Sequence, residues 1–402
     1  MIGEKRTKVG VAMGISEWGF RFSRFTKRGP GVIATSAIAF FACAAVAEAQ
    51  SASVTDNSPT AVADGNIPRT SWGKPDLTGT WTNSSLTELE RESRYGTRLE
   101  MTPEELRQAE GDREEWKAFE RKPSDLSDPN GGCDIKGVGN SVVCGYNSFW
   151  TDPGDTVMRV GGKPRTSFIT STPDGTLPNT IAGVQISRIT NGQEEKTVVQ
   201  RDGGARGGRP PVQPLPGAGP ADDPEIRSVS DRCLLSFGFS AGPVMLPQRY
   251  NSTYFFVQTE DVLAIEVEMV HDVRQIRIGG KHRSDGIRRW MGDSIGWWEG
   301  DTLVAETINY HPYETFFGSS VNLKVTERFT RVAPDRILYQ FQVDDPTVWA
   351  KPWGGEYEFG PSRGPLYEYA CNEGNYSMQH ILAGARVDDA AGAKTAASDG
   401  SE

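Results

Sequence analysis

The sequence predicts a mainly β protein in which an antiparallel meander forms a barrel or a strongly curved sheet, with a few peripheral helices. The main observation is a series of strand-like runs joined by short turns in the second half of the 402-residue chain. The predicted hairpins pair residues 253–258 with 262–278, 295–298 with 302–310, and 323–331 with 336–343. Successive strands with short turns pair with their neighbours, and such meanders close or curve.

A Gly-x-Trp motif begins the predicted sheet. The strand-like run from Asp76 ends in Gly79-Thr80-Trp81. In lipocalin-type barrels a tryptophan in this position plugs one end of the barrel, so the predicted barrel is lipocalin-like by analogy.

Other elements are expected outside the meander. Residues 101–121 read as a surface helix, with Thr102 as N-cap, Pro103 at the first helical position and Glu105 completing a capping box. Residues 165–170 and 367–371 read as short strands, 377–385 as a short helix, and 181–200 as either helix or strand.

The chain is predicted to hold one folded domain between targeting and disordered segments. Residues 1–49 form a secretory signal peptide, because basic residues precede a short apolar run that ends in Ala47-Glu48-Ala49. The predicted order is then a disordered leader at 50–71, a single β-rich domain at 72–386 with a Gly/Pro-rich linker or insert at 201–224, and a disordered tail at 387–402. The mature protein is therefore expected in the periplasm or outside the cell.

The net charge of −10 disfavours nucleic acid and anionic membrane surfaces as partners. No segment after the signal peptide is apolar enough to span a bilayer. The sequence has no phosphate loop or dinucleotide fingerprint, so no cofactor is expected, and the histidine spacing does not indicate a metal site. The expected partner is a hydrophobic or aromatic small molecule, and the oligomeric state stays open.

Four cysteines follow the signal peptide, and an even number in an exported chain indicates disulfides. Pairing Cys133 with Cys144 closes a short Gly-rich loop. Pairing Cys233 with Cys371 ties the start of the main sheet region to its end. This pairing is preferred, although four cysteines allow two others.

His271 is the first candidate catalytic residue. If residues 262–278 form one strand, His271 lies at the end of an apolar stripe, because alternate residues share a face. A dry environment would favour a neutral imidazole that acts as a general base. The alternative is a core histidine bonded to a neighbouring group. Glu268 and Asp272, which could orient the base or act as acid, point to the opposite face of the strand.

Two carboxylates on other strands are therefore better partners for His271. Glu327 interrupts an apolar stripe, and Glu306 is placed similarly on its own strand. An unpaired carboxylate is costly to bury, so Glu327 requires a cationic partner. The candidates named for that partner are Arg288, Arg289 and Arg328. A structural ion pair fits this pattern as well as a catalytic acid does.

Arg289 and Trp290 join two of the predicted hairpins and form a candidate ligand-binding motif. A forked guanidinium and an aromatic ring suit a carboxylate or aromatic ligand, and they also suit closure of the barrel by an arginine stacked on a tryptophan. Trp298 and Tyr310 are further ligand-binding candidates. Trp297 and Trp298 could stack on a glycan, but adjacent residues of a strand face opposite ways.

Several motifs together resemble a poorly characterised family of exported bacterial β-rich proteins. The stretches that carry the resemblance are PDLTGTW (75–81), RTSFITSTPDGTLP (165–178), DRCLLSFGFSAGPVMLP (231–247), EMVHDVRQIRIGGKHR (268–283), WMGDSIGWWEGDTLVAETINY (290–310), ERFTRV (327–332) and YEYACNEGNY (367–376). Proteins of this type usually have histidine where this chain has Asn372. The resemblance implies a fold but no reaction.

The expected function is that of an exported enzyme acting on a hydrophobic or aromatic small molecule in the barrel cavity. Cofactor-free acid/base chemistry, as in a lyase, isomerase or hydrolase, fits the candidate residues. Two alternatives are a non-catalytic carrier of lipocalin type and a glycan-binding or glycan-cleaving module.

Overall fold

The fold was analysed in a computed structural model, which describes residues 67–120, 152, 154–182, 184, 188–190, 193–195, 221–227, 229–235, 242–248, 252–312, 316–319, 321–362 and 364–399. The chain divides into two compact units, Met1–Asp56 and Asn57–Glu402, and all described residues belong to the second. The predicted signal peptide, Cys133, Cys144 and residues 201–220 of the predicted insert lie outside the described residues.

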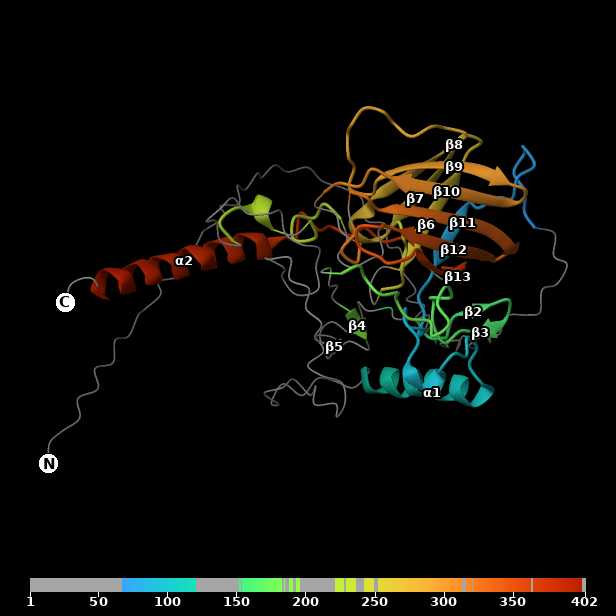
Figure 1. The fold of residues 1–402 in the computed structure, drawn as a ribbon, viewed down its shortest axis with the longest axis horizontal. Helices are drawn as coiled ribbons and strands as arrows, with labels where there is room; N and C mark the ends of the chain where they lie inside the picture. The colour runs from blue at the N-terminus through green and yellow to red at the C-terminus, as the bar shows by residue number, and fades with distance from the viewer. Residues whose placement is uncertain are drawn as a thin grey trace, which may run out of the picture. The chain divides into compact units, whose positions relative to one another are not determined.

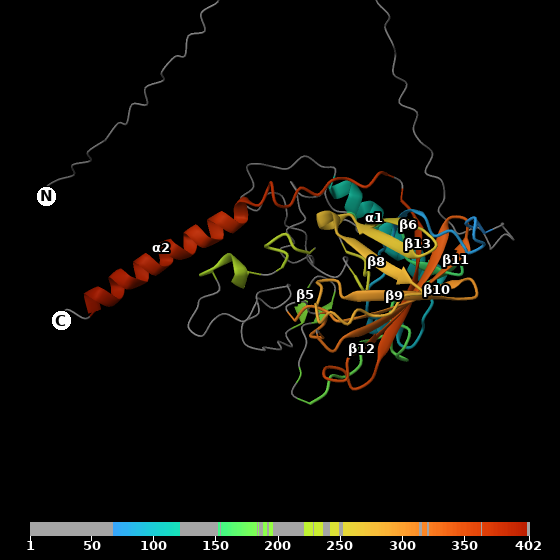
Figure 2. The same cartoon turned by 90° about the horizontal axis from the view of Figure 1, so that it is seen from above.

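This unit contains a closed nine-stranded barrel (Figure 1), which confirms the predicted mainly β barrel. Its strands are β1 (Gly79–Thr82), β6 (Thr253–Gln258), β7 (Val262–Val267), β8 (Val273–Ile278), β9 (Asp293–Glu299), β10 (Thr302–Ile308), β11 (Lys324–Ala333), β12 (Arg336–Asp344) and β13 (Trp353–Pro361). Around the ring they follow the order β1-β13-β12-β11-β10-β9-β8-β7-β6, and β6 pairs with β1 to close it. Figure 2 shows the barrel strands β8 to β12 from above.

The peripheral elements are two helices, four short strands and three 3₁₀ turns in the described part of the chain. They are η1 (Ser93–Tyr95), α1 (Pro103–Glu120), β2 (Arg159–Val160), β3 (Lys163–Pro164), β4 (Arg188–Thr190), β5 (Gln193–Glu195), η3 (Pro224–Ile226), η4 (Met269–His271) and α2 (Tyr376–Asp399). Neither described helix is long and apolar enough to cross a membrane.

The odd number of strands determines one feature of the barrel. Nine strands cannot close into a ring with every neighbouring pair antiparallel. The parallel pair is β8 and β9, with Ile276 opposite Ser294 and Ile278 opposite Gly296. Parallel neighbours need a long connection that returns along the sheet, whereas hairpin neighbours do not. Here the connection runs from Gly279 to Gly292, and it carries His282.

The predicted strand 262–278 is two strands separated by the turn η4. Val270 and His271 adopt left-handed backbone conformations, with φ of 66° and 44°. The buried residues of β7 are odd-numbered, whereas those of β8 are the even-numbered Arg274 and Ile276. The turn thus reverses the alternation, takes Arg274 into the barrel and leaves His271 exposed. For this reason, the prediction that His271 lies in a dry, apolar environment is wrong.

The barrel interior is filled by side chains of the described residues. Seven aromatic residues in it are inaccessible to solvent: Tyr254, Phe256, Phe329, Tyr339, Trp353, Tyr357 and Phe359. Their rings pack mainly edge to face, as when Phe256 meets Phe359 with ring centroids 5.6 Å apart. Met245, from the segment 242–248, joins this core and donates its backbone N–H to the Tyr339 hydroxyl at 3.3 Å. The interior is therefore a packed core, as in other small barrels.

The tryptophan of the Gly-x-Trp motif packs into this core. Trp81 is 3% exposed, and its Nε1 donates to the Leu77 carbonyl at 3.0 Å. The Arg331 guanidinium lies over the Trp81 ring, 5.1 Å from its centroid. An arginine–tryptophan stack therefore does form, but not from Arg289 and Trp290.

Of the predictions for elements outside the barrel, one is confirmed and others are wrong. The capping box is confirmed, because Thr102 N donates to Glu105 Oε2 at 2.8 Å and Glu105 N donates to Thr102 Oγ1 at 3.3 Å. Residues 165–170 form single bridges rather than a strand, among them Ile169 opposite Gly355. No strand forms at 367–371. The strand β13 was not predicted.

The described structure also extends beyond both edges predicted for the domain. Order begins before Trp72, because Arg69 donates to Asp301 Oδ1 at 3.0 Å. At the other end, α2 continues past Val387 to Asp399, where the sequence predicted a disordered tail. Alanine, the strongest helix former, is frequent in this stretch, and its propensity accounts for the extension.

Candidate acid–base site

The strands β8, β9 and β10 bring charged side chains together on the outer face of the barrel. Their registers place Arg277 opposite Ile295, and Ile295 opposite Glu306. The neighbouring residues Ser294 and Thr307 are buried inside the barrel. Strand alternation therefore directs Arg277 and Glu306 outward.

His282, from the connection between β8 and β9, lies between two carboxylates on this face. Its Nδ1 is 3.1 Å from Asp293 Oδ2, and its Nε2 is 3.2 Å from Glu306 Oε1. The side chain of His282 is 19% exposed and that of Glu306 31%, whereas that of Asp293 is 2% exposed. A buried carboxylate thus orients the imidazole, and a solvent-accessible carboxylate contacts its other nitrogen.

Asp293 is held ionised by its surroundings. Burial alone would raise the pKa of its carboxyl, but the hydrogen bonds from Arg277, the Arg283 amide and His282 outweigh burial and bring the pKa well below its ordinary value. Arg277 Nη1 donates to Oδ1 at 2.8 Å, and the Arg283 N–H donates to Oδ2 at 2.9 Å. Asp293 therefore fastens the connection to the barrel and presents a fixed negative charge to His282.

Replacing Asp293 with asparagine is expected to make stability less dependent on pH. Because the folded-state pKa is lowered, the carboxylate stabilises the fold above its unfolded pKa of about 3.9, and this contribution is lost as the pH falls through the folded pKa. At pH 7 the variant should lose roughly 1.5–3 kcal/mol of unfolding free energy, the range for hydrogen bonds to charged groups. Urea unfolding at pH 7, 5 and 3 measures the difference, which should shrink only at the lowest pH.

The exposed Asp285 of the same connection supplies the control for this prediction. It forms an ion pair with Arg289 at 3.6 Å, and both side chains are 36% exposed. Asp285→Asn should leave the unfolding free energy nearly unchanged at each pH. An equal loss in both variants would contradict the role given to Asp293.

The structure does not bring the five predicted catalytic residues together. His271, Glu268 and Asp272 lie in or beside the turn η4, with His271 exposed. Glu327 lies inside the barrel, and Glu306 lies outside it. The histidine near Glu306 is His282, which was not among the candidate residues predicted from the sequence.

The interior carboxylate Glu327 has a cationic partner, as predicted, but the partner is Arg274. Arg274 Nη1 donates to Glu327 Oε1 at 2.9 Å, and Arg274 Nη2 also contacts Oε2. Tyr339 donates its hydroxyl to Oε1 at 2.8 Å. Burial alone would lower the pKa of Arg274, but the charge of Glu327 raises it overall, so the guanidinium stays charged. Their side chains are 2% and 0% exposed, so substrate cannot reach this pair as it stands.

The predicted ligand-binding residues divide between two places. Arg289, Trp290 and Tyr310 meet where the connection approaches the end of β10, and Trp290 lies against His311 with ring centroids 3.9 Å apart. Burial, and secondarily the charge of Arg232, lower the pKa of His311. Trp298 lies farther along β9 and packs on the barrel core. Trp297 is exposed on the opposite face, so these two tryptophans form no common platform.

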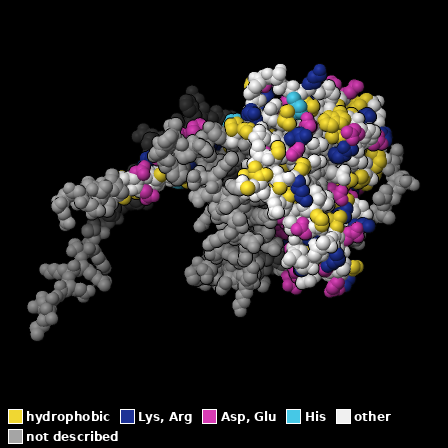
Figure 3. Space-filling model, viewed as in Figure 1, with side chains coloured by type: hydrophobic (Ala, Val, Ile, Leu, Met, Phe, Trp, Pro, Cys, Tyr) yellow, Lys and Arg dark blue, Asp and Glu magenta, His cyan; other side chains and the backbone are white. Residues whose placement is uncertain are grey.

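Within the described residues, no group of three or more His, Cys, Asp or Glu side chains is placed to hold a metal ion. The described acidic and basic side chains are interspersed with hydrophobic ones on the face shown in Figure 3. No protein-family model matches the chain, and no curated protein matches it. Fold and site together define a closed β-barrel protein with a carboxylate–histidine–carboxylate cluster on its outer face.

Proposed function

We propose that the protein is an exported enzyme that performs acid/base chemistry on a hydrophobic or aromatic small molecule, with Glu306 and His282 as the acid–base pair. The observation that supports this most directly is the position of His282 between Asp293 and Glu306. The chemistry is placed outside the barrel, because the interior is filled by side chains of the protein.

Each of the three residues has a separate role in this proposal. Glu306, the most exposed of them, takes a proton from substrate, and His282, as an imidazolium with its Nδ1–H on Asp293, donates its Nε2 proton to another substrate atom. The proton on Glu306 then returns to Nε2 across their 3.2 Å contact, which restores the starting state. The two transfers leave no net proton change, as in an isomerase or in the elimination step of a lyase. Asp293 acts through His282 and is a positioning residue, because it holds Nδ1 and thereby the orientation of the ring.

Two further observations support the substrate class and the location. The half-buried Trp290 and Met291 lie on the same connection as His282 and pack against Val229 and Leu235, so the connection that carries the histidine also carries apolar side chains. The Cys233–Cys371 disulfide is typical of proteins in oxidising compartments and supports export.

The test measures proton exchange at substrate carbon atoms. The wild-type protein is incubated in D₂O with a panel of aromatic ketones and β,γ-unsaturated ketones, and NMR follows the loss of C–H signals. The wild type should exchange at least one class of compound. Glu306→Gln and His282→Gln should each slow exchange by about 10²–10⁴-fold, the usual contribution of a positioned acid or base.

Two other histidines make this experiment specific. His380 is exposed on α2, and His380→Gln should retain the wild-type rate. His271→Gln separates the proposal from the sequence-based one. If His271→Gln abolishes exchange and His282→Gln does not, the base lies at the η4 turn and the proposal is wrong. No exchange by the wild type on any compound also contradicts it.

A further inference from the structure

A second candidate site is a large pocket on the barrel exterior, away from the cluster at His282. Its volume is about 1480 Å³, enough for a drug-sized molecule. One wall comes from the ends of β1, β6 and β13, at Thr82, Thr253 and Gly360. The opposite wall comes from residues 230–233 and from the segment that leads into α2.

The pocket is predominantly acidic. Six carboxylate side chains line it: Asp152, Asp155, Asp231, Glu268, Glu358 and Glu368. The arginines of the lining are Arg159 and Arg336, and both are paired with carboxylates outside the pocket, Arg159 with Glu110 at 3.0 Å and Arg336 with Asp335 at 2.8 Å. Two of the lining carboxylates are also paired with cations outside the pocket, Asp155 with Lys117 at 2.7 Å and Asp231 with Arg227 at 2.9 Å. With all these partners counted, acidic groups still outnumber basic ones in and around the pocket, so its field favours a cation.

Glu358 is the best placed of these carboxylates to meet a ligand. It is half-buried on β13, and its Oε1 accepts the Gly161 N–H at 2.7 Å. Among the described residues it forms no ion pair within 4.0 Å. Burial raises the pKa of Glu358, and a bound cation would offset that effect.

Aromatic and apolar groups accompany these charges. Tyr367, Tyr369, Pro361, Met378 and Ile381 line the pocket, and Tyr367 is 68% exposed. Exposed aromatic rings beside carboxylates suit an organic cation, which gains from the ring face and from the negative charge together.

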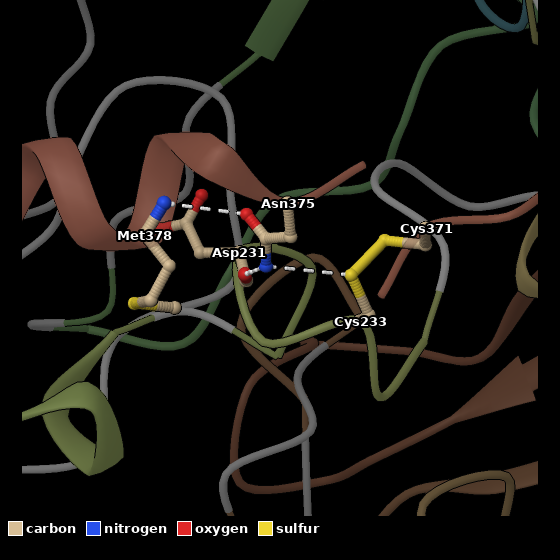
Figure 4. Close-up of a disulfide and its surroundings, with 5 residues drawn as sticks. All are labelled: Asp231, Cys233, Cys371, Asn375 and Met378. Atoms are coloured by element: carbon tan, nitrogen blue, oxygen red, sulfur yellow. Dashed lines mark hydrogen bonds between the residues drawn. A yellow bond between two sulfur atoms is a disulfide. The ribbon is translucent and has the colours of Figure 1, made fainter. Parts of the chain in front are cut away.

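The disulfide holds the second wall of this pocket in place (Figure 4). Cys233–Cys371 joins the two segments that form it. Asn375 Nδ2 donates to the Asp231 carbonyl at 2.7 Å and contacts Cys233 Sγ at 3.5 Å, and Asn375 Oδ1 accepts the Met378 N–H at 3.3 Å (Figure 4). The bond and this amide fix the start of α2 beside the pocket.

We infer that this pocket binds a small organic cation, an amine or guanidinium attached to an apolar or aromatic body, and that the Cys233–Cys371 disulfide maintains the site. Glu358 contacts the cation, and Tyr367 packs on the body. This inference does not depend on the proposed acid–base function.

Two probes with the same ring system and opposite charge test the inference. Isothermal titration calorimetry compares tryptamine with indole-3-propionate on the full oxidised chain at pH 7. Tryptamine should bind at least tenfold more tightly, and Glu358→Gln should weaken it by about tenfold, the lower range for a hydrogen bond to a charged group. The isosteric change keeps an acceptor for the Gly161 N–H.

A control variant and a measurement after reduction of the disulfide complete the experiment. Glu260→Gln, at the far end of the β6–β7 hairpin, should leave tryptamine affinity unchanged. Reduction of the disulfide should weaken tryptamine at least as much as Glu358→Gln does. Equal affinity for the two probes, no binding of tryptamine, or wild-type affinity in Glu358→Gln would each overturn the inference, as would unchanged affinity after reduction.

Discussion

Glu327→Ala is expected to lower the free energy of unfolding by about 3–5 kcal/mol, the usual loss when one partner of a buried ion pair is removed. The variant leaves the Arg274 guanidinium charged and 2% exposed inside the barrel. Of its former partners only Ser294 and Thr307 remain, at 3.2 and 3.1 Å, and neither carries a charge. Tyr339 also loses the carboxylate to which it donates. Urea unfolding followed by tryptophan fluorescence measures the loss.

A surface ion pair on the same strand is the matched control. Arg328 follows Glu327 in β11 but faces outward, where it donates to Glu299 Oε2 at 2.8 Å. Both side chains of that pair are well exposed, so Glu299→Ala should have little effect. The double variant Arg274→Met with Glu327→Leu should regain much of the stability, because it removes both buried charges. A Glu327→Ala variant as stable as Glu299→Ala would contradict this account.

The sequence predicted the barrel well where hydrophobic alternation was uninterrupted. The hairpin β11–β12 followed from period-two patterning and a short turn, and Glu327 was recognised as a buried carboxylate for the same reason. Its partner was missed because η4 reverses the alternation between β7 and β8. In a single strand over 262–278, Arg274 would lie on the face opposite the apolar stripe, whereas in the structure it lies inside the barrel. Nothing local in the sequence marks Val270 as left-handed.

The strand β13 shows a second limit of sequence patterning. Its inward residues Trp353, Tyr357 and Phe359 alternate, but Gly354 and Gly355 lower its strand propensity. The glycines are needed for close packing, since a Cβ on Gly355 would lie 2.1 Å from the Phe168 carbonyl oxygen. The residues that weakened the strand prediction are thus those that let the 165–170 segment dock on the barrel.

The candidate site could not be assembled from the sequence, because its geometry depends on ring closure. His282 and its two carboxylates are separated by 11 and 24 positions in the chain. They meet only because an odd strand number requires one parallel pair and a returning connection. A correct count of the strands would have indicated such a crossover. That count requires β13 and the division of residues 262–278 into two strands, and neither was predicted.

Removing the Cys233–Cys371 disulfide should have the other large effect on stability. The bridge closes a loop with a sequence separation of 138 residues, which contains every barrel strand except β1. In the chain-entropy model a loop of this length stabilises the fold by about 5 kcal/mol, because the bond restricts the unfolded chain. The bond also fixes the start of α2 through Asn375, so the variant should lose local order there.

The double variant Cys233→Ser with Cys371→Ser measures this effect in urea unfolding, compared with oxidised and reduced wild type. If Cys233–Cys371 accounts for all of the stabilisation by disulfides, the double variant and the reduced wild type should unfold at the same urea concentration. A reduced wild type that is less stable than the variant would assign further stabilisation to the predicted Cys133–Cys144 pair. An oxidised wild type no more stable than the variant would contradict the prediction, because the loop ends would then stay together without the bond. Hydrogen exchange at the first turn of α2 separates the two contributions, since the entropic term acts on the whole barrel and the loss of the Asn375 contacts acts only there.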